Sequence, residues 1–369
     1  MTPMFGDETF QFELKPNAAP VAADARDALL VNPGFGRAFT DHMVVIRYTE
    51  GRGWHDACVQ GRAPFQLDPA AAVLHYAQEI FEGMKAYRSP DGGALLFRPD
   101  ANARRFNQSA DRMSMPQLPE HLFLEAVKQL VSIDRDWIPG GEDGSLYLRP
   151  FMIATEVFLG VRPSNEYIFS VIASSVASYF KGAGETVSVW ISQNDTRAAP
   201  GGTGAAKCGG NYAASLRAQG EAMRAGCHQT LFLDAAERRY VEELGGMNVF
   251  FVFDDGSMAT PPLDGTILPG VTRDSVMTLA RARGVEVREE KYAIDQWRAD
   301  AASGRLREAF ACGTAAVIAP IGRLKSPEGE FTVGDPDKAG PVTTELRDTL
   351  VGIQRGLAAD PFGWVHRAY

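Results

Sequence analysis

A glycine-rich stretch around a single lysine constrains this chain more than any other part. Residues 200–212 read Pro-Gly-Gly-Thr-Gly-Ala-Ala-Lys-Cys-Gly-Gly-Asn-Tyr, which places Lys207 between two glycine clusters. Glycine lets the backbone take up positive φ and approach a ligand closely. A flat ligand held against such a backbone, with one amine directed at it, requires this kind of sequence. The competing interpretation is a flexible surface loop, because glycine clusters usually mark loops.

Two nucleotide-binding motifs do not fit this stretch. A P-loop has glycine before its lysine and serine or threonine after it, whereas Ala206 and Cys208 flank Lys207. A dinucleotide-binding fingerprint that starts at Gly202 requires glycine at position 207. A reactive amine remains, because lysine forms Schiff bases with carbonyl compounds such as pyridoxal phosphate and then acts as an acid or base. Lys85 is its nearest rival among the eight lysines.

Composition excludes several classes of protein. The formal net charge of −9 argues against a nucleic-acid-binding surface. A run of about 18 apolar residues is missing, so we expect no membrane span, and the first residues lack a signal-peptide pattern. The cysteines are far apart and form no CxxC pair, which is typical of free thiols in a reducing cytoplasm. We therefore expect a cytoplasmic protein with small-molecule partners and no metal site.

The length and the element pattern predict two domains. Predicted strands and helices mix without a strict βαβ rhythm, which favours an α+β fold. Residues 177–186, Ala-Ser-Tyr-Phe-Lys-Gly-Ala-Gly-Glu-Thr, interrupt the pattern as a linker does. We predict a small N-terminal domain over residues 1–176, an interdomain linker over 177–186 and a larger domain over 187–369.

Hydrophobic periodicity predicts the individual elements. The helical pattern is clear at residues 119–136, and another helix is expected from Asp68-Pro69 to about Gly83. Further helices are expected over residues 101–114, 212–224, 272–283 and 343–356, and strands over residues 43–48, 84–88, 94–98, 146–155, 167–176, 187–191, 230–233, 239–243, 247–253, 285–291 and 308–314.

A pyridoxal phosphate site would also need a carboxylate for the ring nitrogen, because an anion there keeps that nitrogen protonated. Glu242 and Glu243 are candidates. Neighbouring residues of a strand point to opposite faces, so only one of them can serve. The competing interpretation is a pair of exposed surface carboxylates, the usual state of glutamate.

The phosphate and the phenolate oxygen of such a cofactor need donors. Residues 270–272, Gly-Val-Thr, open a predicted helix, and free N–H groups at a helix start bind phosphate. Residues 313–315, Gly-Thr-Ala, could supply more donors, and Arg104 or Arg105 could add charge. Tyr212 is a candidate for the phenolate oxygen. An ordinary helix cap, a plain turn, a solvated arginine and a tyrosine with an arbitrary polar partner are the competing interpretations.

Together these motifs resemble the branched-chain-amino-acid aminotransferases, which are class IV (fold type IV) pyridoxal phosphate enzymes. The resemblance runs from about Phe39 to the last predicted helix. Its motifs occur in the family's order: residues 74–76 (Leu-His-Tyr), 81–86 (Phe-Glu-Gly-Met-Lys-Ala), 146–150 (Leu-Tyr-Leu-Arg-Pro), 207–212 (Lys-Cys-Gly-Gly-Asn-Tyr), 243–248 (Glu-Leu-Gly-Gly-Met-Asn), 267–271 (Ile-Leu-Pro-Gly-Val) and 313–315 (Gly-Thr-Ala).

The resemblance implies a two-domain fold-type IV architecture. It consists of a smaller N-terminal α/β domain and a larger C-terminal mixed α/β pseudo-barrel domain that binds the cofactor. Lys207 would carry the Schiff base, and Lys85 would be structural. The resemblance selects Glu243 for the ring nitrogen and Arg105 for the phosphate, and it places Arg197 near the site. The other implied cofactor-binding residues are Tyr212, Val271, Thr272 and Thr314, and the implied substrate-binding residues are Phe35, Tyr76, Phe81, Tyr147, Arg149, Leu159, Val161, Gly246 and Ala315.

The implied activity is ping-pong transamination. Leucine, isoleucine or valine would leave as its branched 2-oxo acid, and 2-oxoglutarate would leave as L-glutamate. Arg149 could bind glutamate's second carboxylate through charge-assisted hydrogen bonds. The family is homodimeric, and residues 159–161 would reach the partner's pocket. This chain departs from some relatives at Gly246, where they carry threonine, and it lacks their CxxC pair after the Gly-Thr-Ala turn.

Three other functions compete with this interpretation. A D-amino-acid aminotransferase or an aminodeoxychorismate lyase of the same fold would keep the lysine, the glutamate and the phosphate donors. The chain length and the motifs at residues 82–85 and 147–149 argue against both. A non-catalytic ligand-binding protein of this fold is the alternative from another class. The combination of Lys207, Tyr212 and Glu243 argues against it, since site residues rather than fold carry function.

Overall fold

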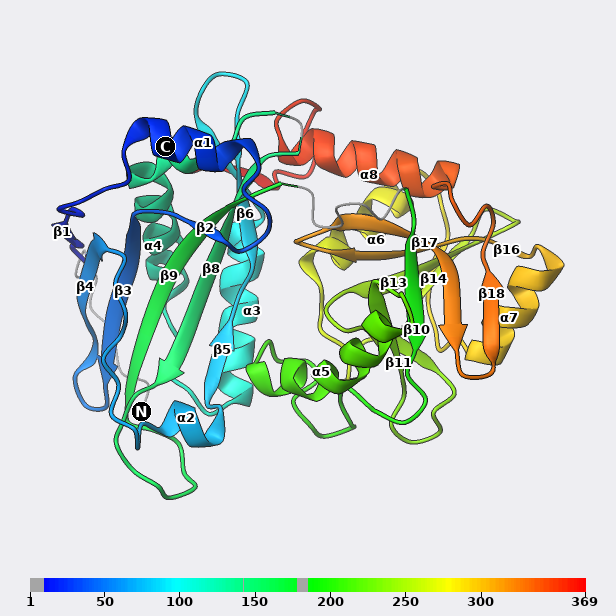
Figure 1. Cartoon of the computed structure of the whole chain (residues 1–369), viewed down its shortest axis with the longest axis horizontal. Coiled ribbons are helices and arrows are strands. Elements are labelled where there is room, and N and C mark those ends of the chain that lie inside the picture. Colours follow the sequence, from blue (N-terminus) through cyan, green and yellow to red (C-terminus); the bar gives the residue numbers. More distant parts are fainter. Residues whose placement is uncertain (1–9, 142, 178–184) are drawn as a thin grey trace. The chain divides into compact units, whose positions relative to one another are not determined.

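The computed structural model describes residues 10–141, 143–177 and 185–369 (Figure 1). The chain divides into two compact units. The first comprises Met1–Arg88, Gly92–Ala177 and Arg367–Tyr369, and the second comprises Ser89–Asp91 and Ser178–His366. The linker expected over 177–186 lies largely at 178–184, outside the described residues, and the division at 1–176 and 187–369 stays a prediction.

The first unit is built on a ten-stranded sheet in the order β1-β4-β3-β9-β8-β6-β7-β19, with β2 on β9 and β5 on β8. Its pairs are antiparallel except β1 with β4, among those whose register is described. Along β8 buried and half-buried residues largely alternate, as expected when one face is covered. The strands are β1 (Glu13–Lys15), β2 (Ala38–Phe39), β3 (His42–Thr49), β4 (Gly53–Gly61), β5 (Glu79–Phe81), β6 (Met84–Arg88), β7 (Ala94–Phe97), β8 (Ser145–Ala154), β9 (Glu166–Val176) and β19 (Val365–Arg367).

Helices cover one face of this sheet. Helix α4 (Glu120–Ile133) packs on β3 and β9, and α3 (Pro99–Arg112) packs on α4 and β5 (Figure 1). The stripe predicted for α4 is buried, because its apolar residues recur at the helical period. Two short helices, α1 (Ala23–Val31) and α2 (Ala72–Tyr76), and the 3-10 turn η1 (Arg135–Trp137) complete the unit.

The helix expected from Asp68-Pro69 to Gly83 is wrong beyond Tyr76. Helix α2 ends there because Ala77 adopts the left-handed conformation, with φ 47°. The next strand is β5, which pairs with the C-terminal part of β8, residues 151–153. Tertiary pairing therefore outweighs the local helical pattern of this segment.

The second unit is built on a nine-stranded sheet in the order β12-β11-β10-β17-β16-β13-β14-β15, with β18 on β17. Its core includes Phe251, whose ring lies 4.5 Å from that of Tyr292 and 4.7 Å from that of Trp297 between centroids. The strands are β10 (Val187–Ile191), β11 (Gln229–Leu233), β12 (Val241–Leu244), β13 (Asn248–Phe253), β14 (Met258–Thr260), β15 (Val287–Glu289), β16 (Leu306–Gly313), β17 (Val317–Ser326) and β18 (Gly329–Thr332).

In the part of this unit that the structure describes, four helices pack on the sheet. Helix α5 (Gly209–Arg224) contacts β10 and β11, α6 (Val271–Ala282) contacts β15, β16 and α8, and α7 (Ile294–Ser303) contacts β16 and β18. Helix α8 (Pro341–Gln354) contacts β16 and β17. The periodicity predicted α5, α6 and α8, but not α7 or the long strand β17.

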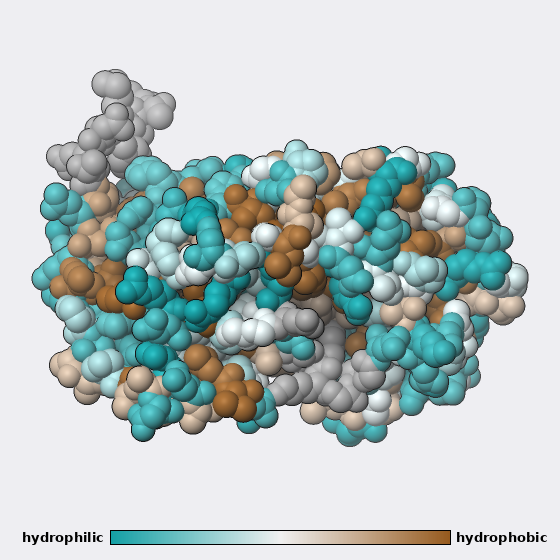
Figure 2. Space-filling model, turned by 90° about the horizontal axis from the view of Figure 1, so that it is seen from above, coloured by the Kyte–Doolittle hydropathy of each residue, from teal (hydrophilic) through white to brown (hydrophobic). Residues whose placement is uncertain are grey.

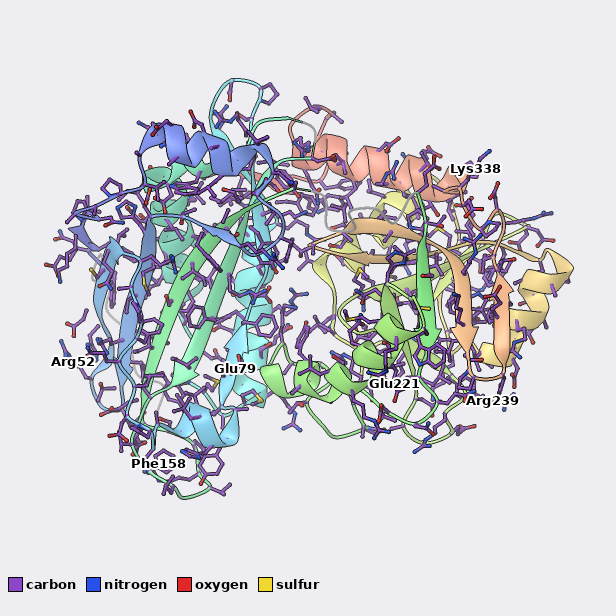
Figure 3. All side chains as sticks on the ribbon, in the orientation of Figure 1. Arg52, Glu79, Phe158, Glu221, Arg239 and Lys338 are labelled. Atoms are coloured by element: carbon purple, nitrogen blue, oxygen red, sulfur yellow. The ribbon has the colours of Figure 1, made fainter. Side chains whose placement is uncertain are left out.

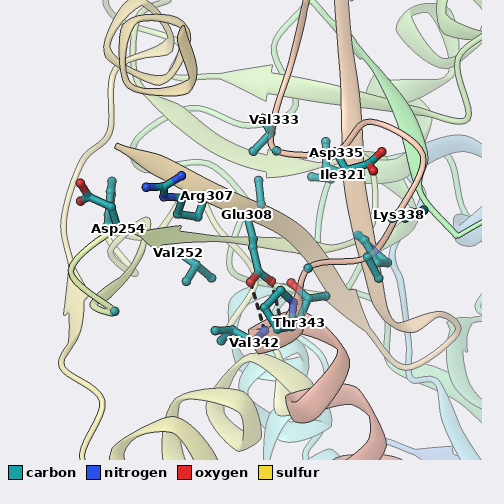
Figure 4. A pocket seen from close by; sticks show the side chains of 18 residues that line it. Val252, Asp254, Arg307, Glu308, Ile321, Val333, Asp335, Lys338, Val342 and Thr343 are labelled. Carbon is teal, nitrogen blue, oxygen red and sulfur yellow. Dashed lines mark hydrogen bonds between the residues drawn. The ribbon is translucent and has the colours of Figure 1, made fainter. Parts of the chain in front are cut away.

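Helix α8 begins at a cavity of about 520 Å³ within the second unit (Figure 4). Its N-cap residue is Gly340, which has no side chain to bond the first N–H groups. Glu308 of β16 takes over this role: its buried carboxylate accepts the N–H groups of Val342 at 3.0 Å and Thr343 at 2.8 Å. A Cβ atom at position 340 would overlap this carboxylate. Glu308 therefore caps α8 from a neighbouring strand and complements the positive end of the helix dipole.

Replacing Glu308 with alanine is expected to lower the free energy of unfolding by about 2 kcal/mol, because a cap is lost and two N–H groups, that of Thr343 buried and that of Val342 half-buried, lose their acceptor. Urea denaturation measures the change. Asp254→Asn is the control, because this exposed carboxylate lines the same cavity (Figure 4). Equal stabilities of the two variants would show that Glu308 does not cap the helix.

The visible face in Figure 2 mixes hydrophilic and hydrophobic residues in small areas. Among the described residues, no helix combines the length and the apolar character that crossing a membrane requires.

Candidate functional site

The glycine-rich stretch is held by Asn211 rather than left as a flexible loop. Asn211 is buried in the first turn of α5, and its amide group donates to the carbonyl oxygens of Thr203 at 2.7 Å and Ala206 at 2.8 Å. Its Oδ1 accepts the Thr203 hydroxyl at 2.7 Å. Gly204 lies so close to the backbone of Thr266 that a Cβ atom there would overlap it. The loop is therefore a fixed support for Lys207.

Lys207 is half-buried immediately before α5, and its amine contacts Tyr212. Nζ donates to the Tyr212 hydroxyl at 2.7 Å and lies 5.1 Å from the centroid of that ring. The spacing of five residues allows this contact because Tyr212 occupies the first turn of the helix. The two residues predicted to bind the same cofactor thus lie together.

Glu243 forms a buried ion pair with Arg197. Nη1 of Arg197 lies 2.7 Å from Oε1 of Glu243, and the two side chains are 2% and 3% exposed. The same carboxylate oxygen accepts the backbone N–H of Leu268 at 3.0 Å. Glu242 is also buried and accepts the hydroxyl of Thr266 at 2.7 Å. The interpretation of two exposed carboxylates is therefore wrong, and β12 holds the segment 266–268 through both of them.

Burial raises the pKa of Glu243 from 4.5 to about 7, although Arg197 opposes the rise. The folded protein therefore binds this proton more tightly than the unfolded chain does. The resulting stabilisation is present below pH 4.5 and is lost as the pH rises through 7.

The thermal midpoint of the cofactor-free protein is accordingly expected to fall between pH 5 and pH 8 more steeply than that of Glu243→Gln, which cannot titrate. Differential scanning calorimetry across this range measures both slopes. Identical slopes would show that the Glu243 carboxyl does not carry the pH dependence.

The predicted phosphate donors lie where α6 begins. Gly270 is the N-cap, and no side chain of the described residues caps the helix. Asn248 holds this turn: its Nδ2 donates to the carbonyl oxygen of Leu268 at 3.0 Å, and a Cβ atom at position 270 would overlap its Oδ1. The first N–H groups of α6, at Val271 and Thr272, are therefore positioned by a buried asparagine of β13. Asn248 lies in the motif at residues 243–248, but its contacts with this turn are visible only in the tertiary structure.

Two tight turns adjoin this region. Thr314 and Ala315 lie between β16 and β17, and Gly246 lies between β12 and β13. A Cβ atom at position 313 would lie 3.5 Å from the carbonyl oxygen of Gly246, so the turns touch. A Cβ atom at position 246 would lie 3.6 Å from Tyr212 Cε1, an ordinary contact. The backbone there does not demand glycine, so the missing side chain leaves space beside Tyr212.

In the first unit, four predicted substrate-binding residues contact one another. The Phe35 and Tyr147 rings meet edge to face at 5.1 Å between centroids, and Arg149 donates from Nη2 to the Tyr147 hydroxyl at 3.2 Å. The Arg149 guanidinium lies 4.7 Å from the Phe81 ring centroid. Its Nε is buried without a hydrogen-bond partner among the described residues. The three rings are apolar, and the Arg149 guanidinium beside them is a cation with one N–H unbonded in the described part of the chain. Such a set suits a ligand that has both a hydrocarbon part and a carboxylate.

The other predicted residues of this unit form two further sets. The Tyr76 hydroxyl donates to the carbonyl oxygen of Leu159, and its ring lies 6.5 Å from that of Phe158, which Figure 3 labels. Leu159 and Val161 are 66% and 90% exposed. Arg105 is buried in α3. Arg104, its exposed neighbour in that helix, bonds Asp100 at 2.6 Å.

The comparisons with known proteins identify the family. The family described as Amino-transferase class IV matches residues 79–324. The chain belongs to this family. The aminotransferase is 57% identical to the probable branched-chain-amino-acid aminotransferase of Streptomyces coelicolor over 356 residues, which cover 96% of this chain and 98% of that protein. It is 55% identical to the branched-chain-amino-acid aminotransferase of Mycolicibacterium smegmatis over 362 residues, 97% of this chain and 98% of that protein.

Solved structures agree with the fold. The branched-chain amino acid aminotransferase of Escherichia coli superposes with a TM-score of 0.70 at 30% identity, over 82% of this chain and 94% of that chain. The branched-chain amino acid aminotransferase of Thermobaculum terrenum, solved in its PLP form, superposes with a TM-score of 0.67 at 23% identity, over 88% of this chain and 98% of that chain. The fold-type IV architecture predicted from the motifs is confirmed, and the chain is an aminotransferase enzyme.

Proposed function

We propose that this aminotransferase exchanges the amino group between branched-chain L-amino acids (leucine, isoleucine and valine) and 2-oxoglutarate, with pyridoxal 5'-phosphate as cofactor. The observation that carries the proposal is the contact between the amine of Lys207 and the hydroxyl of Tyr212, 2.7 Å apart, beside a fixed glycine-rich loop. The relatives of 57% and 55% identity, which span nearly the whole chain, support the substrate class.

The residues of the second unit fit pyridoxal phosphate. This group supplies an aldehyde for covalent attachment of an amine and a ring that accepts negative charge from the reacting carbon. Lys207 offers the amine, Tyr212 a hydroxyl for the phenolate oxygen and Glu243 a buried carboxylate for the ring nitrogen. The uncapped start of α6, at Val271 and Thr272, suits a phosphate. Thr314 and Arg105 are further residues that we propose as phosphate-binding.

Lys207 is proposed to act twice. Its amine would hold the cofactor through the aldehyde and, when free, would move the proton of the substrate's Cα. Tyr212 holds Nζ in place through their 2.7 Å hydrogen bond. Arg197 favours the ionised form of Glu243 against the effect of burial. The cycle is ping-pong, because the first product leaves before the second substrate binds.

The aromatic group of the first unit is proposed to bind the substrate side chain. Phe35, Phe81 and Tyr147 offer apolar surface for a branched side chain, and Arg149 offers its guanidinium to the second carboxylate of glutamate. Tyr76 is proposed as a further substrate-binding residue, and the turns at Gly246 and Ala315 are assigned to the substrate carboxylate.

We further propose a cytoplasmic homodimer in which the exposed Leu159 and Val161 reach the partner's pocket. Both side chains are apolar and largely exposed in the single chain, as expected of residues that a second copy covers.

An absorbance spectrum of the purified protein tests the function. A near-visible band of bound cofactor that L-leucine bleaches and 2-oxoglutarate restores would support both half-reactions. Bleaching by D-alanine but not by L-leucine would favour a D-amino-acid aminotransferase. A missing band after addition of pyridoxal phosphate would favour the ligand-binding protein without catalysis.

A further inference from the structure

We propose that Glu82 is a positioning residue that orients the Arg105 guanidinium for the phosphate of the cofactor. The inference rests on the proposed function, because it takes the phosphate contact of Arg105 from there. Glu82 lies between β5 and β6, and Arg105 lies 23 residues further on, in α3.

The two side chains form a bidentate ion pair. Arg105 donates from Nε to Oε1 of Glu82 at 2.7 Å and from Nη2 to Oε2 at 2.8 Å. The side chains are 7% and 0% exposed. Two parallel bonds fix the plane of a guanidinium as well as its position. Glu82 binds the edge of the Arg105 guanidinium that Nε and Nη2 form. The direction in which Nη1 points is thereby fixed.

Glu82 is itself held from two other directions. Its Oε2 accepts the backbone N–H of Gly83 at 3.1 Å and Nδ2 of Asn102 at 2.8 Å. Gly83 in turn lies against the hydroxyl of Tyr147, which a Cβ atom at position 83 would overlap. The carboxylate therefore links Arg105 to the aromatic group proposed to bind substrate, all within the first unit.

Charge and orientation predict opposite effects of removing Glu82. The glutamate is an anion beside the guanidinium, so it weakens the attraction of Arg105 for a phosphate. If charge alone mattered, a neutral residue at position 82 would tighten phosphate binding. If orientation matters more, the same change would weaken it, because a long side chain freed from a bidentate contact must be ordered again on binding.

The test measures how much the phosphate contributes to binding. The cofactor is removed from the holoenzyme, and dissociation constants are measured for pyridoxal phosphate and for pyridoxal, which lacks the phosphate. For Glu82→Gln we expect the constant for pyridoxal phosphate to rise at least about tenfold and the constant for pyridoxal to stay within about twofold. Glu82→Asp keeps the charge but retracts the carboxylate from Arg105. Its affinity for pyridoxal phosphate should therefore fall as that of Glu82→Gln does. If the glutamine variant does not fold, the aspartate variant tests the positioning role alone.

Asp134→Asn is the matched control. Asp134 is a buried carboxylate of the same unit whose Oδ1 lies 2.7 Å from Nδ1 of His42, and it contacts neither Glu82 nor Arg105 through any described hydrogen bond. This variant should lower the thermal midpoint but leave the ratio of the two dissociation constants unchanged. If Asp134→Asn changed the ratio of the two dissociation constants as much as Glu82→Gln does, Glu82 would have only a general structural role. That result would overturn the inference.

Arg105→Gln separates the inference from the proposed function. If this variant leaves the ratio unchanged, the phosphate contact of Arg105 is wrong and the inference falls with it. If Arg105→Gln lowers the phosphate contribution and Glu82→Gln leaves it unchanged or increases it, only the positioning role is refuted. In the double variant, Glu82→Gln should cause no further loss, since it acts through Arg105.

Discussion

Replacing Lys207 with alanine is expected to abolish transamination, with a fall in kcat of at least about 10⁴-fold. The variant loses the amine that we propose both to attach the cofactor and to move the Cα proton. Neither Tyr212, which accepts the hydrogen bond from Nζ, nor any other residue in a described contact with it supplies a second amine. Formation of glutamate from leucine and 2-oxoglutarate measures the loss.

Two other lysines complete this experiment. Lys338→Ala is the control, because Lys338 is exposed in the same unit, at the cavity beside α8 (Figures 3 and 4), and it should leave kcat unchanged. Lys85→Met tests the rival, which is buried in β6. If Lys85→Met removed activity from a folded protein while Lys207→Ala kept it, the assignment of the reactive amine would be reversed.

Glu243→Gln is expected to reduce kcat by about 10²- to 10³-fold at saturating cofactor, because the ionised group that we propose for the ring nitrogen is replaced by a neutral one. Steady-state kinetics at several concentrations of pyridoxal phosphate separate this effect from weaker cofactor binding. Arg197 loses its partner as well, so the thermal midpoint should also fall.

Glu242→Gln provides the comparison one residue away. Glu242 is likewise buried in β12 and accepts a hydrogen bond from Thr266, so its replacement should also lower the thermal midpoint. Its kcat should stay close to that of the unchanged enzyme. A loss of kcat in Glu242→Gln with activity retained in Glu243→Gln would mean that the other face of the strand holds the cofactor.

Local patterns predicted the elements whose residues repeat regularly. Helix α4 and strand β9 lie where hydrophobic periodicity placed them, because each buries a continuous apolar surface. For the segment after Tyr76, the same periodicity predicted a helix, and that prediction is wrong. Its apolar residues suit a helix, but β8 offers a strand for them to pair with. Helix α7 was missed because its apolar stripe is narrow and only Trp297 and Asp300 are buried.

Residue types and their order along the chain were enough to indicate the chemistry of this protein. The chemical roles of the proposed site depend on residue type. They are therefore recognisable in a lysine between glycine clusters, a tyrosine five residues later and a distant glutamate. The ordered motifs around them identified the family that the comparisons confirm.

How these residues are held became visible in the folded chain alone. The pairs Glu82 with Arg105, Asn248 with Gly270, and Glu308 with the start of α8 join segments that are far apart in the chain. Each depends on sheet register and on the docking of a helix, and no local pattern encodes these distances. A buried carboxylate or amide also looks like a surface residue in the sequence, because burial is a property of the packed chain and not of the residue.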